Sequence, residues 1–183
     1  MEYKISKYPQ FSVCGLNCGL CSRYYTVGSS RCPGCAGEGF LDVHPTCGIL
    51  SCCQRKGLDY CFECNEFPCK KYDNYDETDS FITCKNLFRD MEKAKRDFNA
   101  YKAELNEKMS ILEELLTNYD DGRRKSFYCT AVNLLELDDI KLIMAQIKDR
   151  VDSQSSIKEQ AKVVVGLFQE IANEKGIDLK LRK

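Results

Sequence analysis

The chain of 183 residues contains no tryptophan, a single histidine and only four prolines, and its charges nearly cancel. With 27 basic and 28 acidic residues, it has no general excess of positive charge. Nucleic-acid-binding domains usually carry such an excess, because the release of counterions from phosphates drives their binding. The composition therefore excludes a strongly basic nucleic-acid-binding domain and leaves only a local basic patch open.

Long apolar runs are also missing. No stretch approaches 18 consecutive apolar residues, so we expect no transmembrane helix. The first residues, MEYKISKYPQFSV, contain no apolar core of a signal peptide, so we expect a cytoplasmic, reducing location. In that environment cysteines are expected to bind metal rather than to form disulfides. The odd total of 13 cysteines could not be paired completely in any case.

The second part of the chain lacks the residues that break helices. No glycine or proline occurs between Asp79 and Asp121, and only Cys84 and Cys129 of the 13 cysteines lie beyond residue 78. All four prolines precede that point. This change in composition predicts a cysteine-rich, metal-binding module over 1–78 and a helical domain over 79–183.

Apolar residues recur every three or four positions from Cys84 to Tyr119, which predicts a helical stripe of about ten turns. Asp79 or Ser80 is the expected N-cap, and Asp121 with the following glycine is the expected stop. The alternative is a break near residues 95–97, where charges are dense.

Three further segments have helical patterns. Helices are expected over about 138–151 and about 156–174, each with one apolar face. The segment 127–135 also suits a strand, and we interpret it as a short helix. The predicted fold class is mainly α, with a loop-rich, metal-stabilised N-terminal module followed by an antiparallel helical bundle or a long helical hairpin.

What the sequence has in abundance is cysteine, with 11 of the 13 between Cys14 and Cys69. Three CxxC pairs stand out, because two intervening residues let the backbone turn and aim both sulfurs at one ion about 2.3 Å away. Ten cysteines have the spacing of metal ligands. They are Cys14, Cys18, Cys21, Cys32, Cys35, Cys47, Cys52, Cys61, Cys64 and Cys69. Cys53 is left out, since the side chains of adjacent residues diverge.

Ten ligands exceed the eight that two tetrahedral zinc sites require. Two cysteines are therefore spare, or two sites share ligands, or the metal is not zinc. The favoured early site draws on Cys14, Cys18, Cys21, Cys32 and Cys35. The favoured later site draws on Cys47, Cys52, Cys61, Cys64 and Cys69. The loops that carry them would bury too little apolar surface to fold unaided, and a bound metal would supply the missing stability.

The triplet Cys14-x3-Cys18-x2-Cys21 has the spacing of the radical S-adenosylmethionine cluster motif. Such enzymes need a partial or full α/β barrel, and the sequence shows no pattern that predicts one. An iron–sulfur cluster in electron transfer or redox catalysis is nevertheless the alternative cofactor to zinc.

The remaining candidates carry weaker patterns. His44, the only histidine, precedes Cys47 by three positions and could be a ligand, a turn residue or a base; we favour a surface turn. Cys84 and Cys129 are expected to be buried apolar residues, because cysteine is often buried and no partner base is evident for a nucleophile. No catalytic and no cofactor-binding residue is predicted.

The cysteine-rich part resembles a known family. The segments CGLNCGLCSRYY, CPGC and CGILSCCQRKGLDYCFECNEFPCKKY resemble the bacterial and archaeal "domain of unknown function 3795" over about residues 12–75. The cysteines of that family fall on the ten positions given above, and Cys53 falls where a small residue is more common. The resemblance implies metal binding, with zinc as the expected metal, and offers no reaction.

These features favour a non-catalytic protein. We expect a structural module that holds about two zinc ions, joined to a helical domain with a binding or regulatory role. The expected partner is a protein, or a second copy of the chain that associates through the helices.

Overall fold

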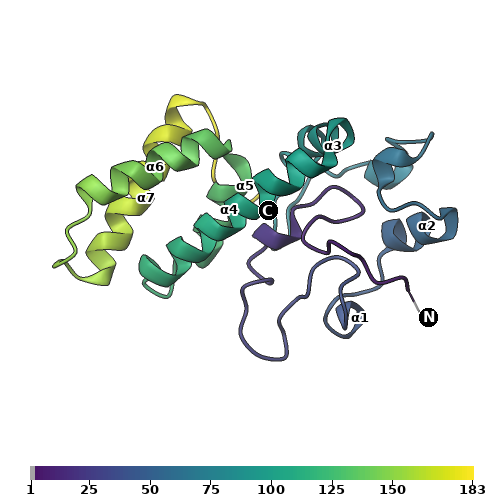
Figure 1. The fold of residues 1–183 in the computed structure, drawn as a ribbon, viewed down its shortest axis with the longest axis horizontal. Coiled ribbons are helices and arrows are strands. Elements are labelled where there is room, and N and C mark those ends of the chain that lie inside the picture. Colours follow the sequence, from purple (N-terminus) through teal and green to yellow (C-terminus); the bar gives the residue numbers. More distant parts are fainter. Residues whose placement is uncertain (1–2) are drawn as a thin grey trace.

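The computed structural model describes residues 3–183, and every regular element in this range is helical (Figure 1). The cysteine-rich part contains η1 (Cys18–Leu20), α1 (Phe40–Val43), α2 (Gly48–Lys56), η2 (Cys61–Glu63) and η3 (Lys70–Tyr72), where η marks a short 3-10 helix. The rest contains α3 (Leu87–Arg96), α4 (Phe98–Asn118), α5 (Lys125–Leu134), α6 (Leu137–Arg150) and α7 (Ile157–Glu174). The mainly α fold with a loop-rich N-terminal part is thus confirmed. None of the described helices combines the length and apolar character that a membrane span requires.

The long helical stripe is divided at Asp97, within the segment where the sequence allows a break. Asp97 has extended backbone, and its carboxylate accepts a hydrogen bond of 3.0 Å from the N–H of Ala100, so it caps α4. The stripe itself is buried on both sides of the break, at Met91 and Ala94 in α3 and at Leu105 in α4. The buried apolar stripe therefore continues across the break and is shared by α3 and α4.

The predicted start of this stripe is wrong. Helix α3 begins at Leu87, and Asp79, proposed as its N-cap, lies well before it. The Asp79 carboxylate accepts hydrogen bonds of 2.8 Å from the N–H of Cys84 and 2.8 Å from the N–H of Arg182, and pairs with the Arg182 guanidinium at 3.0 Å. The Asp79 carboxylate thus binds the C-terminal tail and does not cap a helix. Cys84 is half-buried and precedes the helix.

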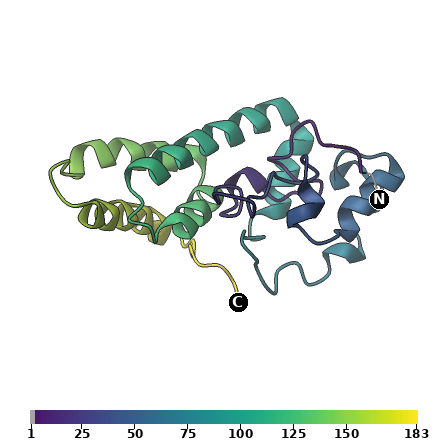
Figure 2. The same ribbon diagram turned by 90° about the horizontal axis from the view of Figure 1, so that it is seen from below.

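The other helices agree with the sequence to within two or three residues. Segment 127–135 is helical within α5, and α6 and α7 form the antiparallel hairpin seen in Figures 1 and 2. Helix α4 ends at Asn118, three residues before the predicted stop. Ser156 caps α7 and forms a reciprocal capping box with Glu159.

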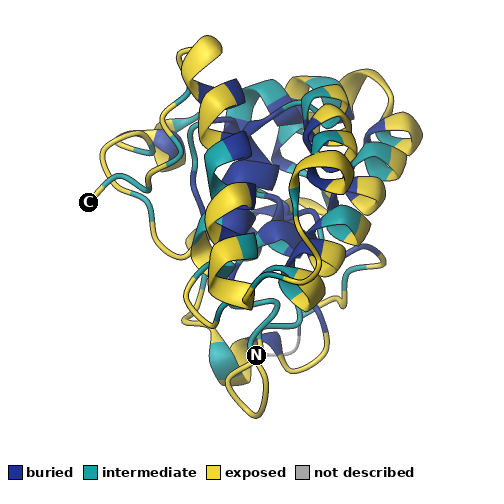
Figure 3. Ribbon diagram, turned by 90° about the vertical axis from the view of Figure 1, so that its left-hand side faces the viewer, coloured by how far each residue is buried: buried dark blue, intermediate teal, exposed yellow. Residues whose placement is uncertain are grey.

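The cysteine-rich loops pack directly against the helices. Gly15 has a φ of +93°, and a Cβ added to it would lie 2.3 Å from Cγ of Met91 in α3. A Cβ added to Gly19 would lie 2.4 Å from Sδ of Met109 in α4. A side chain at Gly15 would be strained by the positive φ, and a side chain at either position would require the facing methionine to move. One continuous set of buried residues consequently runs from Phe11 through the helices, whose buried faces point inward in Figure 3.

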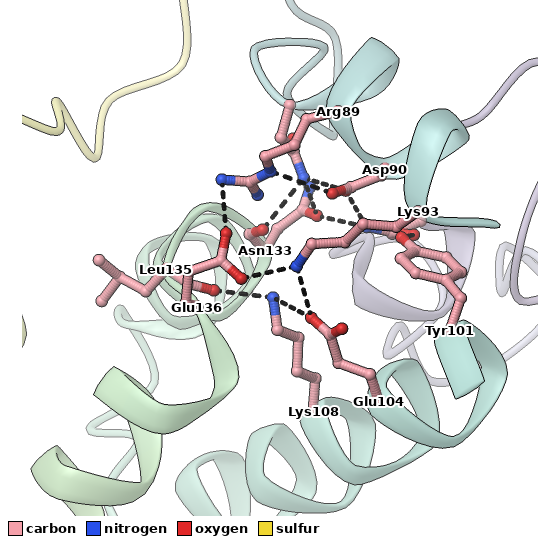
Figure 4. A network of polar contacts seen from close by, with 11 residues as sticks. Arg89, Asp90, Lys93, Tyr101, Glu104, Lys108, Asn133, Leu135 and Glu136 are labelled. Carbon is pink, nitrogen blue, oxygen red and sulfur yellow. Dashed lines mark hydrogen bonds and ion pairs between the residues drawn. The ribbon is translucent and has the colours of Figure 1, made fainter. Parts of the chain in front are cut away.

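A buried polar network reinforces this junction (Figure 4). The Asn17 amide nitrogen donates to Asp90 at 2.8 Å and to the side chain of Asn133 at 2.9 Å, and its oxygen accepts from the Tyr101 hydroxyl at 2.7 Å. Asn86 also donates to Asp90. Since these residues come from the Cys14–Cys18 loop, α3, α4 and α5, one asparagine connects the loops to three helices.

Charged residues continue the network toward the surface. The Lys108 ammonium donates to the Leu135 carbonyl at 2.7 Å and lies 3.8 Å from Glu104, while Lys93 bridges Glu104 and Glu136. Burial lowers the pKa of Lys108 and raises that of Asp90, although their attraction opposes both shifts. Because most donors and acceptors find partners here, we interpret this network as structural rather than catalytic.

Candidate metal centre

Two of the three CxxC pairs form tight turns, whereas the N–H of Cys35 in the third pair donates to the Pro9 carbonyl at 2.8 Å. The N–H of Cys21 donates to the carbonyl of Cys18 at 3.1 Å, which closes η1. The N–H of Cys64 donates to the carbonyl of Cys61 at 3.0 Å, which closes η2 in the same way. Each turn holds its pair of cysteines on one short segment, as the spacing predicts.

Five thiols from three elements line one small cavity, which we call the late cavity. Its volume is about 90 Å³, and it lies between α2, η2 and the loop that leads to η3. The cysteines that line it are Cys52, Cys53, Cys61, Cys64 and Cys69. The space is that of a few atoms, so it suits an ion with its thiolate ligands better than an organic ligand.

Cys53, which sequence reasoning left out, has the closest thiol contact in this cavity. Its Sγ lies 3.3 Å from Sγ of Cys61, and both residues are buried. Two sulfurs bound tetrahedrally to one zinc ion lie about 3.8 Å apart, as follows from the Zn–S distance. The hydrogen bond from Cys53 lowers the pKa of the Cys61 thiol to about 7 and raises that of Cys53. The close contact thus makes the protonation of each thiol depend on that of the other.

The burial pattern of α2 is the signal that identifies Cys53. Leu50 and Cys53 are buried and lie three positions apart, on one face of the helix, whereas Cys52 is half-buried. Adjacent helical side chains point about 100° apart, so Cys52 and Cys53 approach the late cavity from different directions. In the sequence, Leu50 lies three positions before Cys53, and this spacing could have indicated that Cys53 is buried.

Cationic groups stand beside the late cavity. The Lys56 ammonium lies 3.3 Å from Sγ of Cys64 and 3.0 Å from the Glu66 carboxylate, and Lys71 also lines the cavity. A divalent ion with four thiolates carries a net charge of −2, which nearby lysines offset. Lys56 and Lys71 also help to lower the pKa of the Cys61 thiol, after the larger contribution of the contact with Cys53.

The early cysteines gather around Cys18. Burial raises the pKa of this thiol well above its ordinary value, and the nearby Cys35, Cys14, Cys21 and Cys32 raise it further. Burial likewise raises the pKa of Cys14 to about 11, against the hydrogen bond from Ser12 at 3.0 Å. The charges of the other four early cysteines therefore act on Cys18.

Cys47 lies at the start of α2 and contributes to the environment of two early cysteines. Its charge raises the pKa of Cys14 and of Cys35, after burial and other contributions, and it does not line the late cavity. At the start of α2 its Sγ accepts the N–H of Leu50 at 3.5 Å. The assignment of Cys47 to the later or to the early group thus stays a prediction.

The cysteine thiols are suitable metal donors, but they do not surround one point closely enough to bind an ion. All 13 cysteines are free thiols, and thiolates are preferred ligands of zinc and of iron–sulfur clusters. Across residues 3–183, however, no three His, Cys, Asp or Glu side chains converge closely enough to hold an ion. The donor chemistry fits zinc, and a final inward movement of the thiols would be needed to bind it.

The other candidates lie apart from these thiols. The exposed His44 ring stacks on Phe40 at 4.4 Å, and its Nδ1 lies 2.8 Å from the Pro45 carbonyl, as suits a surface turn. Cys129 is buried within α5, as expected. Burial raises its pKa to about 12, which suppresses its reactivity as a nucleophile.

Comparison with known proteins supports the resemblance of the cysteine-rich part. Residues 10–74, which include all 11 clustered cysteines, match the family model described as "Protein of unknown function (DUF3795)". A search of the curated proteins and a search of the solved structures found no match. The match covers the loops, α1, α2 and the short 3-10 helices, and it ends before α3.

Proposed function

We propose that residues 14–69 form a structural metal-binding module of a cytoplasmic protein and hold about two zinc ions. The observation that carries this proposal is the late cavity, which is lined by thiols from α2, η2 and the following loop, beside Lys56. The early cysteines, joined by Cys47, supply the donors of the second ion.

The composition of the ligand set favours a structural role. Sites made only of cysteine are usually structural, whereas catalytic zinc sites keep a water-bearing position and generally include histidine or a carboxylate. The one histidine, His44, stacks on Phe40 in an exposed turn. The bound metal would therefore act as a cross-link between loops that have little regular structure.

Closure of the thiols on binding explains why a metal would stabilise this part of the chain. Few backbone hydrogen bonds connect the segments that share the late cavity, so the thiols can move toward a bound ion at little cost in free energy. Binding energy of structural zinc becomes folding energy in such modules. We infer that the metal completes the folding of residues 14–69.

Metal analysis tests the proposal. The protein is purified without oxygen and without a metal-affinity column, and its metals, acid-labile sulfide and visible spectrum are measured. About two zinc ions per chain and a colourless solution are expected. Protein that is fully folded with no bound metal would contradict the proposal.

An iron–sulfur protein in electron transfer or redox catalysis is the second candidate. It is supported by the triplet Cys14, Cys18 and Cys21, which lie in one region, and by the surplus of thiols. The same measurement separates the two candidates, because iron with an equal amount of sulfide and visible absorption would establish a cluster.

We propose a binding role for the helical part, with a protein or a second copy of the chain as the partner. Three large apolar residues of the α6–α7 hairpin are exposed, namely Leu142, Ile157 and Val163. Sedimentation of the purified protein over a range of concentrations tests for self-association. A strictly monomeric protein would leave a different protein as the expected partner.

A further inference from the structure

A second cavity, which we call the aromatic groove, lies between the N-terminal segment, α2, the segment 58–63 and the α3–α4 junction. Its volume is about 520 Å³, within the range of small-molecule sites. Leu58 lines both this groove and the late cavity, and Tyr60 and Phe62 flank Cys61 in the chain. The groove and the cysteines are thus built on the same segment.

Aromatic rings form one wall of the groove. Tyr60 and Phe62 are stacked, with ring centroids 5.1 Å apart and planes only 8° from parallel. Phe98 lies 4.9 Å from Tyr60, and Phe11 lies 5.5 Å from it on tilted planes. Among the described residues, Phe62 has Tyr60 as its only ring neighbour, and it is half-buried. Because Phe62 lines the groove and is only half-buried, part of its ring is accessible to a planar ligand in the groove.

Unpaired lysines stand around this wall. Lys7, Lys95 and Lys102 line the groove, and within residues 3–183 none of them has a carboxylate at ion-pair distance. Lys102 instead lies over the Tyr8 ring, 4.8 Å from its centroid.

The two acidic residues that line the groove, Asp59 and Glu63, already have partners within the protein. Asp59 pairs with Lys4 at 2.9 Å, and the Glu63 carboxylate accepts the N–H groups of Asp59 and Tyr60 at 2.9 and 3.1 Å. With Lys4 included, four lysines and two carboxylates line the groove, so a chain with a net charge of −1 carries a local excess of positive charge here.

We propose that the aromatic groove binds a nucleoside phosphate, with its base stacked on Phe62 and its phosphates paired with Lys7, Lys95 and Lys102. This ligand uses both features of the groove, since a planar base extends the ring stack and a phosphate neutralises several ammonium groups. An acidic peptide would use the same lysines, but it would not require a stacked ring. The proposal does not depend on which metal the cysteines hold.

Calorimetric titration of the metal-loaded protein with ADP tests the proposal, with adenosine and inorganic phosphate titrated separately. ADP is expected to bind more tightly than either part alone. The double variant K95Q/K102Q is expected to weaken ADP binding about tenfold or more, because two charge contacts are lost. F62A is expected to weaken both ADP and adenosine, by about fivefold or more.

The matched control is K158Q/K162Q, which removes the same charge from the exposed side of α7. It should bind ADP as the unaltered protein does, and equal metal contents before and after titration exclude extraction of metal by ADP. Absence of ADP binding, or binding that K95Q/K102Q leaves unchanged in a folded protein, overturns the proposal. Binding of a glutamate-rich peptide in place of ADP, with the same dependence on the lysines, would assign the groove to an acidic protein segment instead.

Discussion

At the scale of single residues, the pair Cys52 and Cys53 shows how burial separates two neighbours with the same chemistry. Cys53 is buried, and its Sγ lies 3.3 Å from that of Cys61, whereas Cys52 is half-buried on the neighbouring side of α2. Both line the late cavity, but only Cys53 is already within contact of another thiol. The position of a thiol on the helix therefore matters more here than its spacing in the sequence.

Replacing the two cysteines one at a time is expected to separate their roles. C53S should lower the bound metal by one ion per chain, or weaken its affinity at least tenfold, because it removes the thiol nearest to Cys61. C52S, the matched control one position away, should have the smaller effect. Metal content after competition with a chelator measures both, and a larger loss in C52S would restore the grouping predicted from spacing.

At the scale of elements, the segment before α3 is held by the C-terminal tail. Arg182 donates to Asp79 through its backbone and its guanidinium, and its guanidinium also donates to the Asp76 carbonyl at 2.6 Å. The Asp79 side chain is fully buried in this contact. Residues 79–86 are consequently held in non-helical conformation although they contain neither glycine nor proline.

The Asp79 contact should make stability depend on pH. Burial alone would raise the pKa of Asp79, but the hydrogen bonds from Arg182 and Cys84 lower it overall. A carboxyl whose pKa is lower in the folded state stabilises that state above the unfolded pKa of about 3.9 and loses this contribution as the pH falls through the folded value.

The variant D79N tests this dependence. It is expected to lower the free energy of unfolding by about 1–3 kcal/mol near neutral pH, because a buried, charge-assisted contact is removed. The difference between D79N and the unaltered protein should shrink below about pH 4. Urea unfolding at several pH values measures it, with D149N at an exposed position as the control. A difference that stays constant with pH would contradict the assignment.

At the scale of the whole molecule, the cysteine-rich loops and the helices share one interior. Buried residues from Phe11 to Ala172 form a single cluster, and η1 packs against both α4 and α5. The α6–α7 hairpin, by contrast, makes most of its contacts within itself. Loss of order in the loops should therefore spread to α3, α4 and α5 before it reaches the hairpin.

The loss of structure after metal removal is expected to follow this order. Treatment with a strong chelator should abolish protection from hydrogen exchange in residues 14–72, reduce it in α3 and around η1, and change it least in α6 and α7. Mass spectrometry of peptides measures each region, and restored protection after zinc is added back provides the control. Equal loss of protection in all regions would indicate a single cooperative unit, and no loss would contradict a structural role of the metal.

The sequence by itself determined the local features of this protein. Helical periodicity located α5, α6 and α7, and dense charge marked the break at Asp97, because these features depend on neighbours within one or two turns. Cysteine spacing likewise predicted tight turns, which are observed at Cys18–Cys21 and Cys61–Cys64. The resemblance over residues 10–74 is also a property of the sequence alone.

Only the tertiary structure decided which distant residues meet. It brought Cys53 against Cys61, and it used Asp79 to bind Arg182 instead of capping a helix. It also gathered lysines from three segments around the aromatic groove. Spacing limits how far a side chain reaches along its own segment, whereas contacts between segments depend on packing of the whole chain, which no local pattern encodes.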